Sequence, residues 1–370
     1  MNLTEFHNSA PALYRSGTAL ELISGPGVGK SSVMHQVAAF LSKYLGVPFG
    51  IVSLIMSGRD PMDVRGFLMP LKSEGTVEAK YSRPSIFPSP WNIDVYVDGA
   101  RDTDWQGGIP EHGILFLDEF GQADHEVQKP MGELLLEGHM GEHKLGKGWV
   151  VWAASNRTGD RSGVVKELAF LTNRRKVLNI EAQYDPWEAW AMRNHVHALT
   201  IGFAKRHPQE VFKEEVPSKP GPFCTPRSLV LCSQDLEAMR TEEHGDMRLP
   251  DDHIALEVAT GWLGEGTAPQ YMQFVRLAND LPELDDIVKK PDTTMVPERL
   301  DARFVIAMML GHHASKDNMG AVLTYIERID KELQMLFVSS VGKRNPKALA
   351  TREFSAWNAK NTDLTLASLG

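Results

Sequence analysis

The stretch SGPGVGKSS at residues 24–32 most constrains what this chain can fold into. Its glycines permit a tight backbone turn that residues with larger side chains would resist. An apolar run at 19–24 precedes the turn, and apolar residues recur at helical spacing over 30–44 after it. A second apolar run follows at 49–56. This order of strand, glycine loop, helix and strand predicts a parallel α/β sheet.

The glycine loop is close to the phosphate-binding pattern GxxxxGK followed by Ser or Thr. Its backbone N–H groups are expected to form an anion nest, and the following helix adds its positive dipole end. Lys30 would place a charge on the β- and γ-phosphates of ATP, and Ser31 would offer a hydroxyl to Mg²⁺. A turn that binds nothing is the alternative, which the flanking strand and helix disfavour. The expected ATP-binding residues are Gly25, Pro26, Gly27, Val28, Gly29, Lys30, Ser31 and Ser32, while Ser24 departs from the pattern's first glycine.

The stretch GILFLDEFGQAD at residues 113–124 ends an apolar strand in two adjacent acids, Asp118 and Glu119. Unpaired charge at the end of a core strand is costly. In a parallel sheet the ligand lies beyond the carboxyl ends of the strands, where a magnesium-bound triphosphate would offset that cost. We expect Asp118 to help hold Mg²⁺ and Glu119 to take a proton from the water that attacks the γ-phosphate. The alternative is a strand that exits to solvent through two acids.

Another polar residue, Asn156, follows the apolar run of the stretch GWVVWAASN at 148–156. A strand lying between those that carry the loop and the acids would place this amide near the γ-phosphate. The alternative is an ordinary asparagine in a turn.

Composition sets broad limits on the kind of protein. The 370 residues carry a net charge of −9, which argues against a surface coated with phosphate-binding positive charge. The two cysteines, Cys224 and Cys232, form no CxxC pair and favour a reducing environment. The N-terminus lacks an apolar signal region, and no run approaches the roughly 18 apolar residues of a membrane span. We therefore expect a cytoplasmic protein with no membrane partner.

The second part of the chain has a helical pattern. Thr225 is suited to a helix N-cap, and Pro226 to the first helical position. Within 319–338 the apolar residues trace one helical face. We therefore expect an α/β nucleotide-binding core over residues 1–195, followed over 196–370 by an α-helical lid and a C-terminal helical region.

The motifs in this order resemble those of the AAA+ ATPases. More narrowly, GPGVGKS, ILFLDEFGQADHEVQKPMGELLLEG, WVVWAASNR, FLTNRR and CTPRSL resemble the MoxR-like branch, especially its phage-encoded members. The resemblance covers about residues 10–235 with specific motifs. It implies a five-stranded parallel sheet in the order 5-1-4-3-2, a helical lid, and a ring, usually of six subunits, with ATP bound between neighbours.

The resemblance also implies roles for single residues. Lys30 and Ser31 belong to the Walker A motif, and Asp118 and Glu119 to the Walker B motif. Asn156 matches sensor 1. The resemblance further implies that Arg174 is the arginine finger that reaches the next subunit's site, and that Arg227 is sensor 2 on the lid.

The two arginines can also be argued from their chemistry. A guanidinium is a good clamp for the negative charge that spreads over a transferring phosphoryl group. Arg227 lies near the start of a helix, where the helix dipole disfavours a cation, and a bound phosphate would explain its presence. A plain surface arginine is the alternative. Arg175 competes with Arg174 for the finger role, although it is also placed to begin the fifth strand, and the remaining candidates are Arg157 and Arg161.

Two segments depart from the MoxR pattern or leave their role open. The acids are followed by Phe and Gly, where MoxR proteins usually read DEIN, so the contacts around the catalytic pair are expected to differ. MoxR proteins carry a β-hairpin in their second helix, and residues 67–81 are placed to form it with a turn at 73–75. Phe67, Lys72 or Tyr81 would then lie near a central pore, and a surface hairpin without substrate contact is the equal alternative.

Several other signals point to no function. The histidines of HMGEH at 139–143 and of the pair at 312–313 lack the spacing of a zinc protease helix, and a hairpin is expected at 139–143. Trp187 and Trp190 are expected to pack rather than to stack on bases.

These patterns support three hypotheses for function. The first is an ATPase that hydrolyses ATP in a ring to remodel a client protein or complex, working with a separate partner that bears a von Willebrand A-type domain. The second, less favoured, is a nucleic-acid-associated ATPase such as a helicase loader or clamp-loader-like factor, suggested by the basic residues Lys343, Arg344, Lys347 and Arg352. The third is a nucleotide-gated scaffold with slow hydrolysis. If the gene belongs to a phage, the location is the host cytoplasm.

Overall fold

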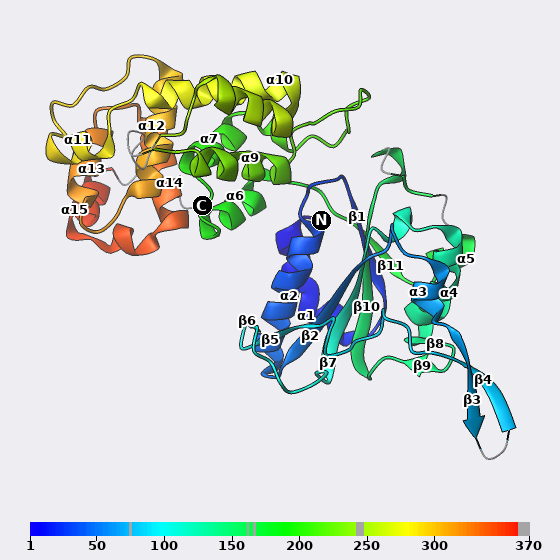
Figure 1. The fold of residues 1–370 in the computed structure, drawn as a ribbon. Helices are drawn as coiled ribbons and strands as arrows, with labels where there is room; N and C mark the ends of the chain where they lie inside the picture. Colours follow the sequence, from blue (N-terminus) through cyan, green and yellow to red (C-terminus); the bar gives the residue numbers. More distant parts are fainter. Residues whose placement is uncertain (74–75, 161–162, 166–167, 242–247, 362–370) are drawn as a thin grey trace. The chain divides into compact units, whose positions relative to one another are not determined.

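The chain forms two compact units in a computed structural model. The structure describes residues 1–370 except 74–75, 161–162, 166–167, 242–247 and 362–370. Unit 1 comprises residues 1–182 and 214–216, and unit 2 comprises residues 183–213 and 217–370 (Figure 1). The domain extents 1–195 and 196–370 expected from the sequence stay a prediction.

A mostly parallel sheet forms the centre of unit 1. Five parallel strands lie in the order β11-β1-β10-β7-β2, which is the expected order 5-1-4-3-2. An antiparallel pair that the sequence did not predict extends the sheet beyond β2. The strands are β1 (Leu20–Ser24), β2 (Phe49–Ile55), β5 (Asp94–Val97), β6 (Ala100–Asp102), β7 (His112–Asp118), β10 (Gly148–Asn156) and β11 (Lys176–Asn179).

Helices cover both faces of this sheet (Figure 1). On one face lie α1 (Leu3–Arg15) and α2 (Lys30–Leu45), whose apolar sides pack in one cluster with Leu22 and Trp152. On the other face lie α3 (Pro61–Arg65), α4 (His125–Glu137) and α5 (Ala169–Thr172), and α4 packs against Leu117 and Ala153. A parallel sheet buried on both faces needs near-continuous apolar strands, as the runs at 114–117 and 149–154 provide. Short 3₁₀ turns follow β7 at Phe120–Gln122 and β10 at Thr158–Asp160.

The hairpin expected at 67–81 forms from β3 (Leu68–Ser73) and β4 (Thr76–Tyr81), with Leu68 opposite Tyr81. Its expected turn at 73–75 falls largely on residues 74–75, outside the described residues, and so does the Lys72 side chain. Phe67 is 60% exposed and Tyr81 is 48% exposed. The hairpin projects away from the main sheet in Figure 1.

A second short hairpin confirms that residues 139–143 form no helix. It pairs β8 (His139–Met140) with β9 (His143–Lys144). It begins directly after α4, which ends at Gly138 in a left-handed conformation.

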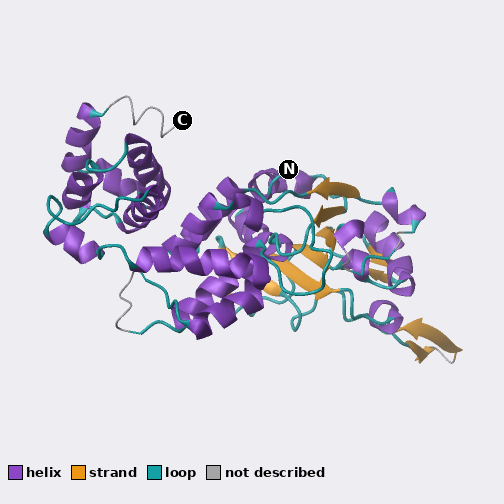
Figure 2. Ribbon diagram, turned by 90° about the horizontal axis from the view of Figure 1, so that it is seen from above, coloured by secondary structure: helices purple, strands orange, loops and turns teal. Residues whose placement is uncertain are grey.

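The described part of unit 2 is helical (Figure 2). Its helices are α6 (Tyr184–Arg193), α7 (Ala198–Arg206), α8 (Pro208–Val211), α9 (Pro226–Ala238), α10 (His253–Asn279), α11 (Leu284–Lys289), α12 (Leu300–His313), α13 (Met319–Ile326), α14 (Lys331–Arg344) and α15 (Arg352–Lys360), with a 3₁₀ turn at Pro346–Ala350. None of the helices in the described ranges is long and apolar enough to span a membrane.

Local sequence accounts for several helix ends in unit 2. The Thr225 hydroxyl accepts a hydrogen bond from the Ser228 amide at 3.1 Å, so the expected cap of α9 is confirmed. The apolar face expected over 319–338 belongs to two helices, because Asp330 takes an extended backbone conformation and begins α14. Inside α10 the helix is interrupted at Gly264, whose φ is +77° and where a Cβ would lie 2.3 Å from the Pro222 carbonyl oxygen.

A buried carboxylate links three helices of unit 2. Glu188 is 1% exposed and accepts a hydrogen bond from the Tyr184 hydroxyl at 2.7 Å. Lys343 pairs with the same carboxylate, and the Lys205 ammonium lies 3.7 Å from it. Arg344 contacts His195 at 3.4 Å. Two members of the expected basic cluster therefore make contacts inside unit 2.

His312, in the last turn of α12, gives unit 2 a stability that depends on pH. Burial, together with the nearby His313 and Arg344, lowers the pKa of His312 to about 3 from 6.5. Below pH 6.5 the unfolded chain therefore binds more protons than the folded chain. The stabilisation is complete above that pH and is lost as the pH falls toward 3.

We predict that His312 makes the wild type lose about 2 kcal/mol of unfolding free energy when the pH falls from about 7.5 to about 5. His312→Gln should remove that part of the pH dependence, whereas His253→Gln, at an exposed position, should not. Urea unfolding of the three proteins at both pH values measures the difference. Equal losses in wild type and His312→Gln would contradict the prediction.

Candidate functional site

The glycine loop joins the end of β1 to the start of α2. Gly27 and Gly29 have φ values of +71° and +108°, in the left-handed region that glycine adopts without strain. Gly29 is the N-cap of α2 and offers no capping side chain. The amides of the first turn of a helix lack intrahelical acceptors, so this end is open to an anionic ligand.

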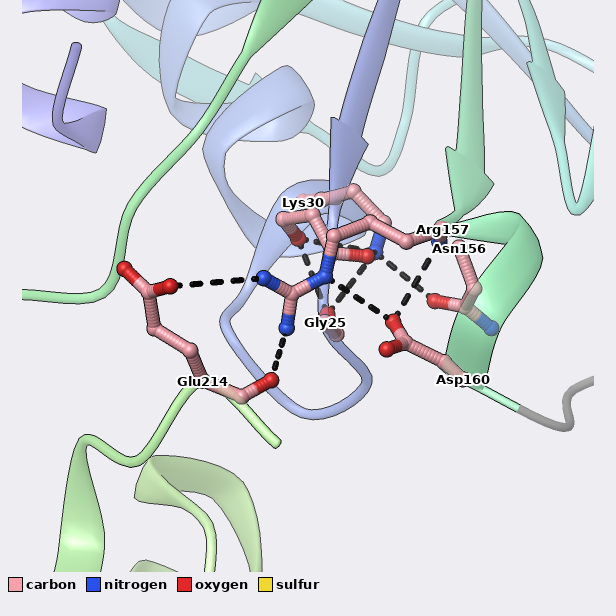
Figure 3. A network of polar contacts seen from close by, with 7 residues as sticks. Gly25, Lys30, Asn156, Arg157, Asp160 and Glu214 are labelled. Atoms are coloured by element: carbon pink, nitrogen blue, oxygen red, sulfur yellow. Dashed lines mark hydrogen bonds and ion pairs between the residues drawn. The ribbon is translucent and has the colours of Figure 1, made fainter. Parts of the chain in front are cut away.

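Lys30 is the first residue of α2, directly after the loop, and is 7% exposed. Its ammonium donates to the Ser24 hydroxyl at 2.9 Å, to the Gly25 carbonyl at 3.1 Å and to the Asn156 side-chain oxygen at 2.9 Å (Figure 3). Ser24 and Asn156 lie opposite one another in the parallel pairing of β1 with β10. The register of these two strands therefore places the lysine and the asparagine together.

Ser24 is the position where the sequence departs from the phosphate-loop pattern. The residue is 1% exposed, and its hydroxyl donates to the Gly25 carbonyl at 2.9 Å while accepting from Lys30. A glycine at this position would lack that hydroxyl. Ser24 thus gives the Lys30 ammonium one more hydrogen-bond acceptor.

Ser31 and Asp118 meet across the end of the sheet. The Ser31 hydroxyl donates to a carboxylate oxygen of Asp118 at 2.5 Å. Asp118 is the last residue of β7 and lies opposite Ile55 of β2. Hydroxyl and carboxylate oxygens are the hard ligands that Mg²⁺ prefers, and Mg²⁺ usually keeps waters and phosphate oxygens in its remaining positions. The donor set therefore fits a magnesium ion bound with a triphosphate.

Glu119 has an unusual backbone conformation for a residue with a long side chain. Its φ and ψ are 54° and 34°, in the left-handed region where such residues are uncommon. Its amide donates to Asp118 at 3.0 Å, and its carboxylate accepts a hydrogen bond from the Ser57 hydroxyl. Ser57 follows the carboxyl end of β2, so it reaches this site for the same reason as the two acids.

Arg157 follows Asn156 and lies beside the glycine loop (Figure 3). Its Nε donates to Asp160 at 3.2 Å, and another guanidinium nitrogen donates to the backbone carbonyl of Glu214. A Cβ on Gly25 would lie 3.0 Å from that guanidinium. The absence of a side chain at Gly25 therefore makes space for the Arg157 guanidinium. Both residues belong to unit 1.

The two adjacent arginines after α5 have different surroundings. Arg175 is 2% exposed and binds the buried carboxylate of Glu21 through two nitrogens, at 2.5 and 2.6 Å. Arg174 is half-buried, with its guanidinium 5.2 Å from the ring centroid of Phe170. A Cβ on Gly132 of α4 would lie 2.8 Å from the same guanidinium. Among the described residues, no carboxylate is paired with Arg174.

Two further arginines were predicted from sequence, Arg227 and Arg161. Arg227 is exposed on the first turn of α9 in unit 2, next to Pro226. Its role toward a nucleotide stays a prediction. Arg161, the other candidate finger, lies outside the described residues.

Sequence reasoning missed three residues in or next to the site. Ser57 binds Glu119, and Glu21 and Ser155 form a buried chain of contacts next to Asn156. Ser57 could have been found from its place directly after an apolar strand. Glu21 gave a weaker signal, a single charge within the apolar run at 19–24.

This chain has low similarity to several solved structures. The sequence matches no protein-family model and no curated protein. Among solved structures, a mutant of RuvB from Thermotoga maritima is similar, with 15% identity over 78% of this chain and 75% of that chain and a TM-score of 0.36. A proposed ATPase from Cytophaga hutchinsonii has 16% identity over 74% of this chain and 88% of that chain, with a TM-score of 0.31.

NtrX from Brucella abortus, in complex with ATP, has 14% identity over 98% of this chain and 67% of that chain, with a TM-score of 0.33. At TM-scores this low, the strand order of the chain itself defines its fold class. A parallel sheet in the order 5-1-4-3-2, with the glycine loop directly after its first strand, is the phosphate-loop α/β fold expected from the sequence.

The loop geometry leads to a prediction about nucleotide binding. Loss of one charge-assisted contact costs about 2 kcal/mol, so Lys30→Met should raise the Kd for ATP roughly thirtyfold. Lys43→Met, at an exposed position on the same helix, should leave the Kd unchanged. Titration with a fluorescent ATP analogue measures both values. Equal Kd values for the two variants would contradict a phosphate site at this loop.

Proposed function

We propose that this protein is an AAA+ ATPase of the MoxR-like type, which hydrolyses ATP in a ring of subunits and remodels a client protein or complex. One observation carries the ATPase proposal. At the carboxyl end of the sheet, Lys30 contacts Asn156 and Ser31 contacts Asp118, so three distant parts of the sequence meet there. The phage origin suggested by sequence resemblance is part of the same proposal.

Each residue of the site has a distinct task in this proposal. Lys30 binds the β- and γ-phosphates, while Ser31 and Asp118 hold the Mg²⁺ that accompanies the triphosphate. Glu119 accepts the proton of the attacking water, and Asn156 orients the γ-phosphate. With Mg²⁺ held there, its positive charge would help to neutralise the phosphate oxygens.

Arg174 is the proposed finger that completes the site of a neighbouring subunit. The buried ion pair between Arg175 and Glu21 supports this choice, because a guanidinium that is paired inside its own subunit is not placed to bind a neighbouring subunit's nucleotide. The packing of Arg157 beside its own Gly25 argues against Arg157 in the same way. Arg227, which stays the proposed sensor 2, would act from the helical unit.

The proposed client is a protein, with a separate von Willebrand A-type partner as suggested by the family resemblance. The exposed rings of Phe67 and Tyr81 on the projecting hairpin support a protein contact. The nucleic-acid alternative rested on the basic cluster, of which Lys343 pairs with Glu188 and Arg344 contacts His195. The pairing of Lys343 with a carboxylate reduces the positive charge available to phosphate, so we favour the protein client.

The catalytic proposal predicts a specific effect of Glu119→Gln. Removal of a general base lowers turnover by roughly 10²-fold or more, while the amide keeps the size of the side chain and ATP binding is retained. Steady-state phosphate release, together with the Kd for ATP, measures the two effects. If the wild type releases no phosphate at ring-forming concentrations, hydrolysis is not the function and the scaffold hypothesis takes its place.

The proposed finger predicts an effect that acts between subunits. Arg174→Ala should lower kcat by about 10³-fold, because a finger stabilises the charge of the transition state. Arg15→Ala, at an exposed site of α1, is the matched control and should have wild-type turnover. Mixing Arg174→Ala subunits with Lys30→Met subunits should restore part of the activity, since the latter still supply a finger. Full activity of Arg174→Ala by itself would exclude this residue.

A further inference from the structure

Unit 1 contains a buried ion pair that has no role in the proposed catalytic steps. The side chains of Glu21 and Arg175 are each 2% exposed, and the contacts between them measure 2.5 and 2.6 Å. Glu21 lies on β1 opposite Ala153 of β10, on the sheet face covered by the apolar cluster that contains Leu117 and Leu171. A carboxylate in such surroundings is costly unless it is fully paired.

On one side, the pair connects to the loop that follows Glu119. The Ser155 hydroxyl donates to the other carboxylate oxygen of Glu21 and accepts a hydrogen bond from the Gly121 amide at 2.7 Å. Gly121 also accepts from the Val165 amide at 3.0 Å. Ser155 immediately precedes Asn156, so this side of the network holds the backbone on which two proposed catalytic side chains depend.

On the other side, the pair connects to the backbone of the proposed finger. Arg175 donates from a third nitrogen to the Leu171 carbonyl at 2.8 Å. The same carbonyl accepts the backbone amide of Arg174 at 3.1 Å. The Arg175 guanidinium also lies 5.6 Å from the ring centroid of Phe120, the residue directly after Glu119. One guanidinium therefore contacts both the finger segment and the loop of the catalytic acids.

Stability alone is a weak reason for a chain to keep this pair. Replacement of a buried ion pair by well-packed apolar residues is often neutral or stabilising, because both charges must be removed from water. A role in fixing one geometry is the better-supported use of such a pair, and it has to be tested in each protein. Here the geometry that the pair fixes is that of segment 171–174 relative to loop 119–121.

We propose that Glu21 is a positioning residue that holds Arg174, through Arg175 and the Leu171 carbonyl, in the orientation needed by the neighbouring subunit's nucleotide. Through Ser155 and Gly121 the same carboxylate ties that orientation to the Glu119 loop of its own subunit. This inference rests on the proposed function, since it requires that Arg174 act between subunits. Nucleotide binding within one subunit is expected to persist without the pair, because the Lys30 ammonium also donates to Ser24 and Gly25, and Ser31 binds Asp118.

The first test separates positioning from folding. Glu21→Gln should lower kcat by roughly ten- to a hundredfold, the effect of misplacing a catalytic group by about 1 Å, and should leave the Kd for ATP unchanged. Glu188→Gln is the matched control, because it neutralises a carboxylate that is buried and paired to a similar degree in unit 2. The control should have wild-type kcat. Equal effects of the two substitutions on kcat would overturn the proposal.

A second variant keeps the test decisive if Glu21→Gln fails to fold. Glu21→Leu combined with Arg175→Met replaces the whole pair by apolar side chains and leaves no charge unpaired. This double variant should unfold at a wild-type urea concentration and still lose kcat by a similar factor. Wild-type kcat in a stable double variant would show that the pair is only structural and would overturn the proposal.

The third test asks in which subunit the defect acts. Subunits with Glu21→Gln, or with the double substitution, are mixed with excess Lys30→Met subunits, whose finger segment is intact. Turnover per ATP-binding subunit should rise at least severalfold, as it should for Arg174→Ala in the same mixture. No rise for the Glu21 variants, when Arg174→Ala is rescued, would overturn the positioning role alone. No rise for Arg174→Ala, or no wild-type turnover, would overturn the proposed function instead.

Discussion

The parallel pairing of β1 with β10, and of β10 with β7, is the constraint on which the rest of this structure depends. It places Ser24 opposite Asn156 and brings the end of β7 to the same edge of the sheet. Lys30 and Ser31 are the first residues of α2, after the loop that follows β1. Their side chains therefore reach Asn156 and Asp118. A slip of one residue in either pairing would turn the side chains to the opposite face of the sheet and separate these groups.

The same pairing explains why charged groups are tolerated inside unit 1. The two buried charges of Lys30 and Glu21 each have a partner outside their own element. Lys30 has the acceptors of β1 and β10, and Glu21 has Arg175 at the start of the fifth strand. Such charges are costly when one partner is absent, so they make the relative positions of the strands specific. Precise relative positions are what phosphoryl transfer requires from a protein.

Much of the sheet could be predicted because each main strand corresponds to one continuous stretch of sequence. The apolar runs that became β1, β2, β7 and β10 are continuous in sequence, and their ends are marked by Gly, Asp or Asn. The antiparallel β5 and β6 were missed, because their four and three residues lie in a segment rich in Pro, Gly and Asp. The helical face over 319–338 was predicted correctly as apolar, but the break between α13 and α14, with Asp330 in an extended conformation, was not predicted.

The order of the five parallel strands was expected from the resemblance to the AAA+ ATPases, whereas the sequence by itself determined the phosphate loop and the two acids. These features depend on residues close together in the chain and on the known rules for parallel sheets. Only the tertiary structure decided which partner each polar side chain has. The choice between Arg174 and Arg175 is an example, since both are arginines at adjacent positions and only the approach of Glu21 distinguishes them. Contacts of this kind join residues that are far apart in sequence, so no local pattern contains them.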